Sequence, residues 1–174
     1  MLRGERVALR PVERVDLPLL ESWVNDPNAN GEYNDFGLEG RQGMEQDFAK
    51  SGFLDDRQGM LLIVLLTDEV IGSVSYRQVA YGPNSGSQAY AIGISLVAAQ
   101  RGYGYGAEAQ RLLPAYLFDT YPIARVQAET DVTNLAEQRS LEKAGFTREG
   151  ILRQAQWRTG ARHDLVMYSK LRGE

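Results

Sequence analysis

The stretch SLVAAQRGYGYGAEAQRLL, residues 95–113, joins an apolar run to a helical pattern through three closely spaced glycines. Gly102, Gly104 and Gly106 alternate with tyrosines, although every glycine adds conformational freedom that folding has to remove. Backbone N–H groups at the start of a helix lack partners and attract anions. The stretch therefore predicts a backbone cradle for a diphosphate, with Arg101 adding a charge-assisted contact.

The glycine spacing does not match two familiar phosphate-binding loops. No Gly-Lys-[Ser/Thr] follows the glycines, so the loop is not a Walker motif. Its G-x-G-x-G spacing also differs from the Rossmann G-x-G-x-x-G, and it lies past the middle of the chain instead of in a first βαβ unit. The alternative is a structural turn that needs positive φ angles, and the loop alone leaves the two interpretations open.

The composition indicates one globular domain over residues 1–174. The chain is 43% hydrophobic and 24% charged, as ordinary globular domains are. It has no cysteine and a single histidine, His163, which excludes disulfides, thiolate nucleophiles and multi-histidine metal sites. We therefore expect no metal cofactor.

Charge and hydropathy limit the partners and the location that we expect. The net charge of −4 argues against general nucleic-acid binding, which needs a basic face. The first residues lack the apolar region of a signal peptide, and the longest apolar run, residues 60–66, is too short to cross a bilayer. The expectation is a cytoplasmic protein with no nucleic-acid or membrane partner.

Hydrophobic periodicity predicts an α+β or mixed-sheet domain. The predicted helices cover residues 17–25, 41–50, 104–120 and 134–144, and a polar loop covers 28–40. The predicted strands cover residues 6–10, 60–66, 70–81, 88–97, 125–130, 147–158 and 163–171.

A second motif follows the glycine loop after one predicted strand. Residues 134–150 read NLAEQRSLEKAGFTREG, with Gly145 placed to end a helix and Phe146 placed to pack back on Leu141. Together with Arg101-x-x-Gly104-x-Gly106, this pattern resembles the GNAT superfamily of acetyl-CoA-dependent N-acyltransferases, and most of all its RimJ/RimL branch of ribosomal-protein N-terminal acetyltransferases. The resemblance covers nearly the whole chain. It implies a mixed, mostly antiparallel central sheet flanked by helices.

The resemblance also implies acetyl-CoA as the acyl donor. The glycine loop would hold the CoA pyrophosphate by main-chain N–H groups, and the strand before it would pair with the pantetheine arm. That strand would splay away from the strand at 125–130 and leave the slot for acetyl transfer. The implied cofactor-binding residues are Ile94, Leu96, Arg101, Gly102, Tyr103, Gly104, Tyr105, Gly106 and Asn134.

The residues that move protons are harder to assign, because the chain departs from the family pattern. Ala91 stands where many relatives carry a glutamate base, and Leu141 stands where many carry a tyrosine acid. Glu137 occupies the position of a serine that is frequent in the RimJ/RimL branch. It is the first candidate for proton handling, although Asn134-x-x-Glu137 also matches a variant capping box in which Glu137 holds the helix start.

Two further residues complete the catalytic candidates. Glu129 either faces the slot or points outward, depending on the register of its strand. His163 has the intrinsic pKa of a base but could equally form the wall of a pocket. A base-free mechanism with water chains is the remaining alternative. The catalytic candidates are Glu137, Asn134, Glu129 and His163.

The loop between the first two predicted helices contains NGEYNDFG, residues 30–37, and in the family this loop lines the acceptor site. Its acidic residues would favour a cationic amine, and its aromatic residues would stack on that amine or form a cation–π contact. The alternative is a solvated acidic loop with two aromatics packed in the core. The candidate acceptor-binding residues are Glu32, Tyr33, Asp35, Phe36, His163 and Asp164.

The function implied by the resemblance is transfer of an acetyl group from acetyl-CoA to a primary amine by direct attack. The acceptor would be a small cationic amine, an amine-bearing antibiotic or a protein N-terminus. Loss of the usual acid and base favours the alternative of a non-catalytic acyl-CoA-binding sensor or interaction domain on the same fold. An unrelated nucleotide-binding domain is a third interpretation. A homodimer is compatible with the sequence, which does not specify the oligomeric state.

Overall fold

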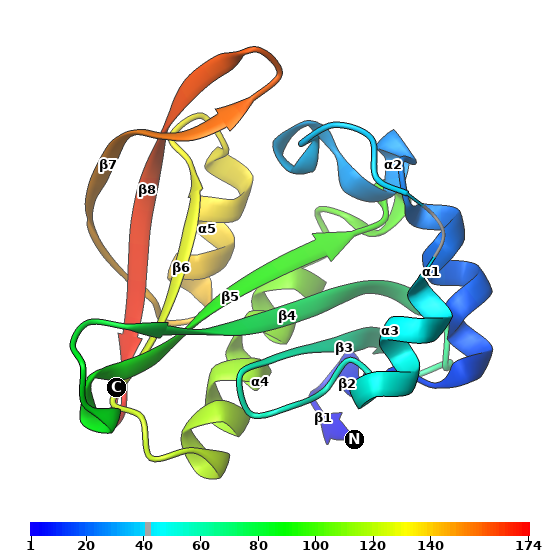
Figure 1. Cartoon of the computed structure of the whole chain (residues 1–174), viewed down its shortest axis with the longest axis horizontal. Helices are drawn as coiled ribbons and strands as arrows, with labels where there is room; N and C mark the ends of the chain where they lie inside the picture. Colours follow the sequence, from blue (N-terminus) through cyan, green and yellow to red (C-terminus); the bar gives the residue numbers. More distant parts are fainter. Residues whose placement is uncertain (41–42) are drawn as a thin grey trace.

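A single eight-stranded sheet forms the centre of the described part of the chain (Figure 1). The computed structural model describes residues 1–40 and 43–174. The spatial order of the strands is β1-β2-β3-β4-β5-β6-β8-β7, and every neighbouring pair is antiparallel except β5 and β6. The strands are β1 (Leu2–Arg3), β2 (Val7–Pro11), β3 (Gln58–Leu65), β4 (Val70–Ala80), β5 (Gln88–Leu96), β6 (Arg125–Asp131), β7 (Thr147–Arg158) and β8 (Ala161–Leu171).

Helices cover both faces of this sheet, as Figure 1 shows. They are α1 (Leu17–Trp23), α2 (Pro27–Asn30), α3 (Met44–Ser51), α4 (Tyr105–Thr120) and α5 (Leu135–Lys143). The predicted α+β class with a mixed, mostly antiparallel sheet is confirmed. Among the described residues, no helix is both long and apolar enough to cross a membrane.

The two faces of the sheet bury separate hydrophobic clusters. Successive strand residues point to opposite faces. Val7 and Leu9 of β2 accordingly pack in the cluster that contains Leu113 of α4, whereas Ala8 packs in the cluster that contains Leu20 of α1. Helices α4 and α5 therefore cover one face, and α1 and α3 cover the other.

The sheet divides between β5 and β6. These parallel strands pair at only three positions, from Tyr90 with Val126 to Ile92 with Ala128. Beyond that point β5 stays paired with β4 as far as Leu96, while β6 stays paired with β8. The predicted splay is confirmed, and Figure 1 shows the two strands diverging toward α2 and α5.

The polar stretch at 28–40 is more ordered than the predicted loop. It contains the end of α2 and a 3₁₀ turn over Glu32–Asn34. Helix α2 forms because Asp26 caps it by accepting from the Asn28 N–H at 3.0 Å, with Pro27 in the first turn. Helix α1 ends at Trp23 instead of at the predicted residue 25, and Asp26 and Pro27 begin the next helix. The predicted helix at 41–50 corresponds to α3, and its residues 41–42 lie outside the described residues.

The end of α5 follows its sequence signal. Gly145 adopts a φ of +87°, which favours glycine. Its N–H donates to the Glu142 carbonyl, and the Phe146 N–H donates to the Leu141 carbonyl, both at 3.0 Å. These two bonds form a Schellman motif, and the buried Phe146 and Leu141 belong to one hydrophobic cluster. The predicted stop of this helix is confirmed.

Candidate functional site

Gly102 and Gly104 lie just before α4, Gly106 lies in its first turn, and the three glycines differ in what surrounds them. Gly102 and Gly104 have φ angles of +85° and +83°, where other residues are strained. A Cβ on Gly102 would meet open space, but a Cβ on Gly104 would lie 3.1 Å from the guanidinium of Arg6. A Cβ on Gly106 would contact Ser140 of α5 at 3.4 Å. All three glycines border a cavity, and Gly104 and Gly106 also allow close packing within the protein.

Arg6 supports the glycine loop from outside. Its guanidinium donates to the Tyr103 carbonyl at 2.8 Å and to the Glu108 carboxylate at 3.1 Å. It also lies over the ring of Tyr105, which stacks against the 61% exposed Tyr103. The loop carbonyls thus face Arg6. Within the described residues no side chain caps the first turn of α4, so its N–H groups are available to a ligand.

Arg101 occupies a different place from the one predicted. We expected its guanidinium to face a phosphate, but it donates to the Leu96 carbonyl at 2.9 Å and to the Asn28 and Ala29 carbonyls at 3.2 and 3.3 Å. These contacts tie α2 to the end of β5. The side chain still borders the cavity described next.

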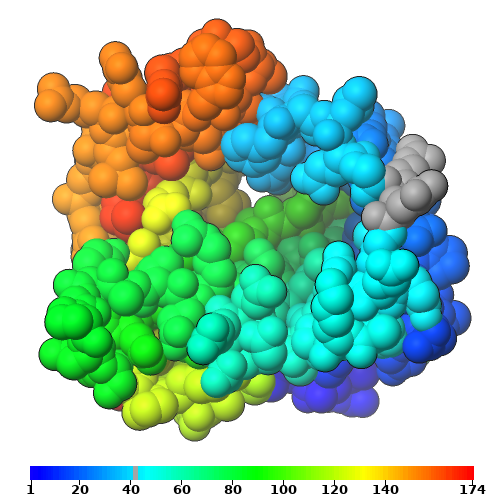
Figure 2. All heavy atoms as spheres, in the orientation of Figure 1, coloured from blue at the N-terminus to red at the C-terminus, as the bar shows by residue number. Residues whose placement is uncertain are grey.

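A cavity of about 400 Å³ opens where the sheet divides. Figure 2 shows this part of the molecule hollowed between the blue residues around α2, the green residues of β5 and the yellow residues that lead into α5. We call it the glycine-loop cavity. It is lined by residues 30–34 and 94–96, Arg101, Gly102, Gly104, Gly106, Ala107, Asn134, Ala136, Glu137, Arg139, Ser140 and Lys143.

One face of α5 supplies much of this wall. Ala136, Arg139, Ser140 and Lys143 are spaced as neighbours on one side of a helix, and two of them are cationic. Sequence reasoning missed all four residues. Their i, i+3, i+4, i+7 spacing after Asn134 is a signal that could have identified them.

Glu137 lies at the glycine-loop cavity, but not as the predicted reciprocal cap. The side-chain oxygen of Asn134 does cap α5, because it accepts from the Glu137 N–H at 3.2 Å. The backbone N–H of Asn134, which a capping box would pair with the Glu137 carboxylate, donates to the Asp131 carbonyl instead. The Glu137 carboxylate instead accepts from the amide of Gln110 on α4. Burial raises the pKa of Glu137 to about 7, against the opposing effect of the Gln110 hydrogen bond. The reciprocal capping box is therefore wrong, and the side chain borders the glycine-loop cavity instead.

Glu129 does not border the slot in this structure. Its carboxylate accepts from the Gln127 amide at 3.0 Å and lies 3.8 Å from the Arg77 guanidinium. The alternation of β6 turns Glu129 away from the face where Val126 and Ala128 are buried against the helices. Glu129 lines neither the glycine-loop cavity nor a second cavity on the other side of the 30–34 segment.

His163 belongs to a buried ionic network at the tip of the β7–β8 hairpin. Asp131 accepts from the Arg158 guanidinium at 2.6 Å and lies 3.1 Å from Nδ1 of His163. The other ring nitrogen, Nε2, lies 3.2 Å from the Arg158 carbonyl. Burial would raise the pKa of Asp131, but hydrogen bonds from Thr133 and Arg158 outweigh it and hold that pKa at about 2. His163 lines neither cavity, so this geometry gives no support to its predicted role as a base or as a pocket wall.

Asp164 also has a structural partner. Its carboxylate accepts from the Gln154 N–H at 2.7 Å, at an irregular point of β7 where Gln154 has a φ of +50°. This contact stabilises a strained backbone position, and Asp164 lines neither cavity. The predicted contact of Asp164 with an acceptor therefore has no support in this geometry.

The aromatic residues of the 30–37 loop behave differently from each other. Tyr33 borders the glycine-loop cavity, with the Arg158 guanidinium 5.4 Å from its ring centre. One cation therefore already covers the ring that we expected to contact an amine. Phe36 is 57% exposed and lines neither cavity, so it neither packs in the core nor faces a ligand here.

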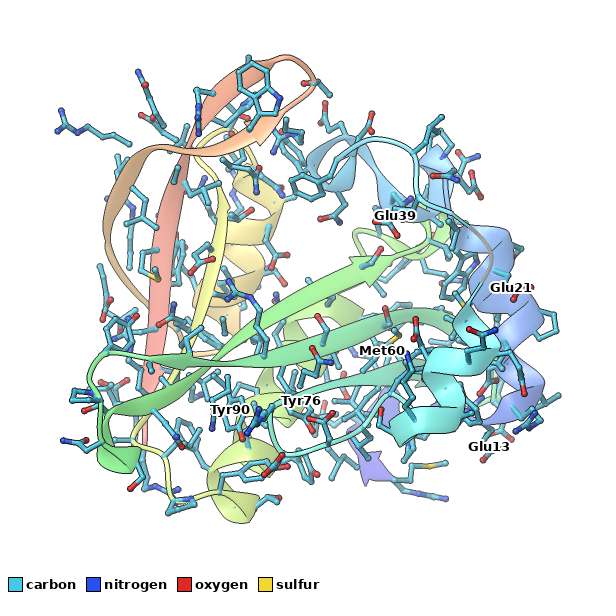
Figure 3. The ribbon with its side chains drawn as sticks, in the orientation of Figure 1. Glu13, Glu21, Glu39, Met60, Tyr76 and Tyr90 are labelled. Atoms are coloured by element: carbon cyan, nitrogen blue, oxygen red, sulfur yellow. The ribbon has the colours of Figure 1, made fainter. Side chains whose placement is uncertain are left out.

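A second cavity, of about 590 Å³, lies on the other side of the 30–34 segment. We call it the acidic cavity, because Glu32, Asp35 and Glu39 line it and no Lys, Arg or His does among the described residues. Figure 3 shows Glu39 on the segment beside α2 and Met60 on β3. Both side chains line the acidic cavity, and Met60 adds apolar surface to its wall. The two cavities share Asn30, Gly31, Glu32, Asn34 and Ser95 as a common wall.

Comparisons with known proteins agree with this arrangement. Residues 6–147 match the model of the acetyltransferase (GNAT) domain. The chain is 29% identical to a probable N-acetyltransferase, YjcK, of Bacillus subtilis, over 88% of this chain and 87% of that protein. It is 26% identical to an uncharacterized N-acetyltransferase, p20, of Bacillus licheniformis, over 99% and 97% of the two chains.

Two solved structures share the fold at low sequence identity. A spermidine N-acetyltransferase of Vibrio cholerae in complex with CoA and spermine has a TM-score of 0.81 at 20% identity, covering 97% of this chain and 96% of that one. RimL, a ribosomal L7/L12 alpha-N-protein acetyltransferase in complex with coenzyme A, has a TM-score of 0.79 at 22% identity, covering 97% and 95%.

Proposed function

This chain belongs to the GNAT family of acetyltransferases and is an N-acetyltransferase of that family; from this premise we propose that it transfers acetyl from acetyl-CoA to a small cationic amine. The observation that carries the proposal is the pair of cavities. They meet at one wall where β5 leaves β6, and they differ in charged residues. Both cations and carboxylates line the glycine-loop cavity, namely Arg101, Arg139 and Lys143 with Glu32 and Glu137. Among the described residues, the charged groups of the acidic cavity are all carboxylates, namely Glu32, Asp35 and Glu39. An anionic donor and a cationic acceptor would therefore reach the same wall from two sides.

The glycine-loop cavity suits the donor. The uncapped start of α4 offers N–H groups to a pyrophosphate, and Arg139 and Lys143 add positive charge on the wall of α5. Past Ile92, β5 has one edge that β6 no longer covers, so an extended pantetheine arm could pair with that backbone. The two structural neighbours described above were solved with CoA, which supports the same placement.

Glu137 is our proposed proton-exchanging residue. In the reaction the amine nitrogen forms a bond to the acetyl carbonyl carbon, and the bond from that carbon to the CoA sulfur breaks. The amine loses a proton and the thiolate gains one, so a group with a pKa of about 7 can serve in either direction. Glu137 reaches the glycine-loop cavity from α5, whose start holds Asn134 at the same wall.

The acidic cavity suits the acceptor. Its three carboxylates would attract an ammonium group, and its wall of Trp23 and Met60 would cover a hydrocarbon chain. The neighbour named as a spermidine N-acetyltransferase acts on such a polyamine, which supports this class of acceptor here. An anionic or neutral amine would gain no favourable charge contact in this cavity.

The test has two steps. Thermal unfolding with acetyl-CoA, CoA, ATP and NAD should show a shift of several degrees with the two CoA species alone, since a ligand at about 100 times its Kd adds about 2.7 kcal/mol. Thiol release should then be measured with spermidine, an aminoglycoside and an N-terminal peptide, and spermidine should react fastest. Binding of acetyl-CoA without turnover on any amine would instead favour the non-catalytic sensor.

A further inference from the structure

Gln110 is a buried polar side chain whose amide nitrogen and amide oxygen both form hydrogen bonds from α4 to α5. It lies on α4, is 1% exposed and reaches across to α5. Its amide nitrogen donates to the Glu137 carboxylate, and its amide oxygen accepts from the Ser140 hydroxyl at 2.8 Å. A buried amide with both ends paired favours one arrangement of its neighbours.

The orientation of this amide follows from the chemistry of its partners. An ionised carboxylate only accepts hydrogen bonds, so the amide nitrogen must face Glu137. The opposite orientation would place two acceptors together and would leave the amide nitrogen against Ser140. The ionised carboxylate therefore sets the orientation of the amide, and the Ser140 hydroxyl, which can donate or accept, donates to the amide oxygen in that orientation.

We propose that Gln110 is a positioning residue for Glu137: its amide nitrogen holds the carboxylate at the wall of the glycine-loop cavity, and the Ser140 hydroxyl anchors the amide oxygen at the other end. The proposal rests on the proposed role of Glu137 in proton exchange. Gln110 itself lies behind the wall and touches no substrate, because it is not among the residues that line the cavity.

Other charged and titratable groups near Glu137 do not replace this contact. Arg139 and Lys143 of α5, Arg101 of the glycine loop, and Glu32 and Tyr33 of the 30–34 segment line the same cavity. Burial raises the pKa of Glu137, and the Gln110 hydrogen bond lowers it. Removing the amide donor should leave burial unopposed and make the carboxylate a weaker acid.

The experiment is a titration of the Glu137 carboxyl carbon by ¹³C NMR in the full chain, with the pH profile of kcat/KM measured beside it. In Gln110→Met, which keeps the volume and removes the donor, the pKa of Glu137 should rise by about one unit. The acid limb of the activity profile should move by the same amount. Ser140→Ala should move both in the same direction by less, and it keeps the test decisive if Gln110→Met folds poorly.

Gln127→Met is the matched control, because Gln127 is also a buried glutamine bonded to a glutamate, but that glutamate is Glu129. It should leave the Glu137 titration unchanged. An unchanged Glu137 pKa in folded Gln110→Met and Ser140→Ala would overturn the inference. A raised pKa with an unmoved activity profile would support Gln110 as a positioning residue and would count instead against the proton-exchanging role of Glu137.

Discussion

The two cavities that meet at the divided sheet are built in contrasting ways. The glycine-loop cavity is built largely from backbone and fixed elements: a helix start, a strand edge and one face of α5. The acidic cavity is built mainly from side chains on the segment between α1 and α3, together with α1 and the strands beneath. Backbone geometry accommodates one ligand shape, whereas loop side chains can change without disturbing the sheet. Under the proposed function, the donor would occupy the cavity of backbone and fixed elements, and the acceptor would be selected by the loop side chains.

The largest effect is expected from Gly104→Val, which changes the backbone at the start of α4 in the glycine-loop cavity. A β-branched residue at a φ of +83° is strained by about 1–3 kcal/mol, and its side chain would displace Arg6. Loss of aligned N–H donors adds about 1 kcal/mol each. Acetyl-CoA affinity, measured by calorimetry, should fall about a thousandfold. Unchanged affinity would contradict the proposal that acetyl-CoA binds in the glycine-loop cavity.

Glu137→Gln should have the next largest effect, because it removes the proposed proton carrier without changing the size of the side chain. The rate constant kcat should fall about a hundredfold while acetyl-CoA affinity stays close to that of the wild type. If Glu137 acts as a base, wild-type kcat/KM should decline as the pH falls through about 7, since protonation removes the reactive form. Retained activity in this variant, with the same pH profile, would eliminate Glu137 from the mechanism.

Removal of charge from the acidic cavity should have an intermediate effect confined to the acceptor. In the double variant Asp35→Asn, Glu39→Gln, which changes side chains of the acidic cavity alone, the KM for spermidine should rise about tenfold, while kcat and acetyl-CoA affinity change little. Steady-state kinetics at two salt concentrations provide the measurement. Asp119→Asn, at the exposed far end of α4, is the control for a general loss of negative charge. Equal KM changes in both variants would mean that the acidic cavity does not select the amine.

Tyr33→Leu should have the smallest effect, and it tests whether the segment between the two cavities depends on the contact of Tyr33 with Arg158. The change removes the cation–π contact with Arg158, which is worth about 0.5–1 kcal/mol at a partly exposed site. The KM for the amine should rise two- to fivefold if this contact holds the shared wall in place. The kinetic change should be accompanied by faster amide hydrogen exchange in residues 30–34 but not in the glycine loop. A loss of acetyl-CoA affinity as large as that of Gly104→Val would contradict the division into two separately built cavities.

Local sequence signals determined much of the structure around the glycine-loop cavity. The G-x-G-x-G loop, the Asn134 cap and the Gly145 stop each act over a few residues, so their meaning can be read without knowing the fold. The order of the helices and strands followed from the period of apolar residues for the same reason. These patterns also carried the family resemblance, which in turn implied the division between β5 and β6.

Only the tertiary structure decided which side chains meet. Glu137 is paired with Gln110 of α4 instead of closing its own helix start, and His163 is bound to Asp131 and Arg158 instead of facing a ligand. The acidic residues near 32–39 were visible in the sequence, but the cavity that gathers them requires α1, β3 and β5 as its other walls. Sequence reasoning could not reach these contacts, because partners far apart in the chain are chosen by packing and burial, whereas caps and turns are chosen by neighbouring residues.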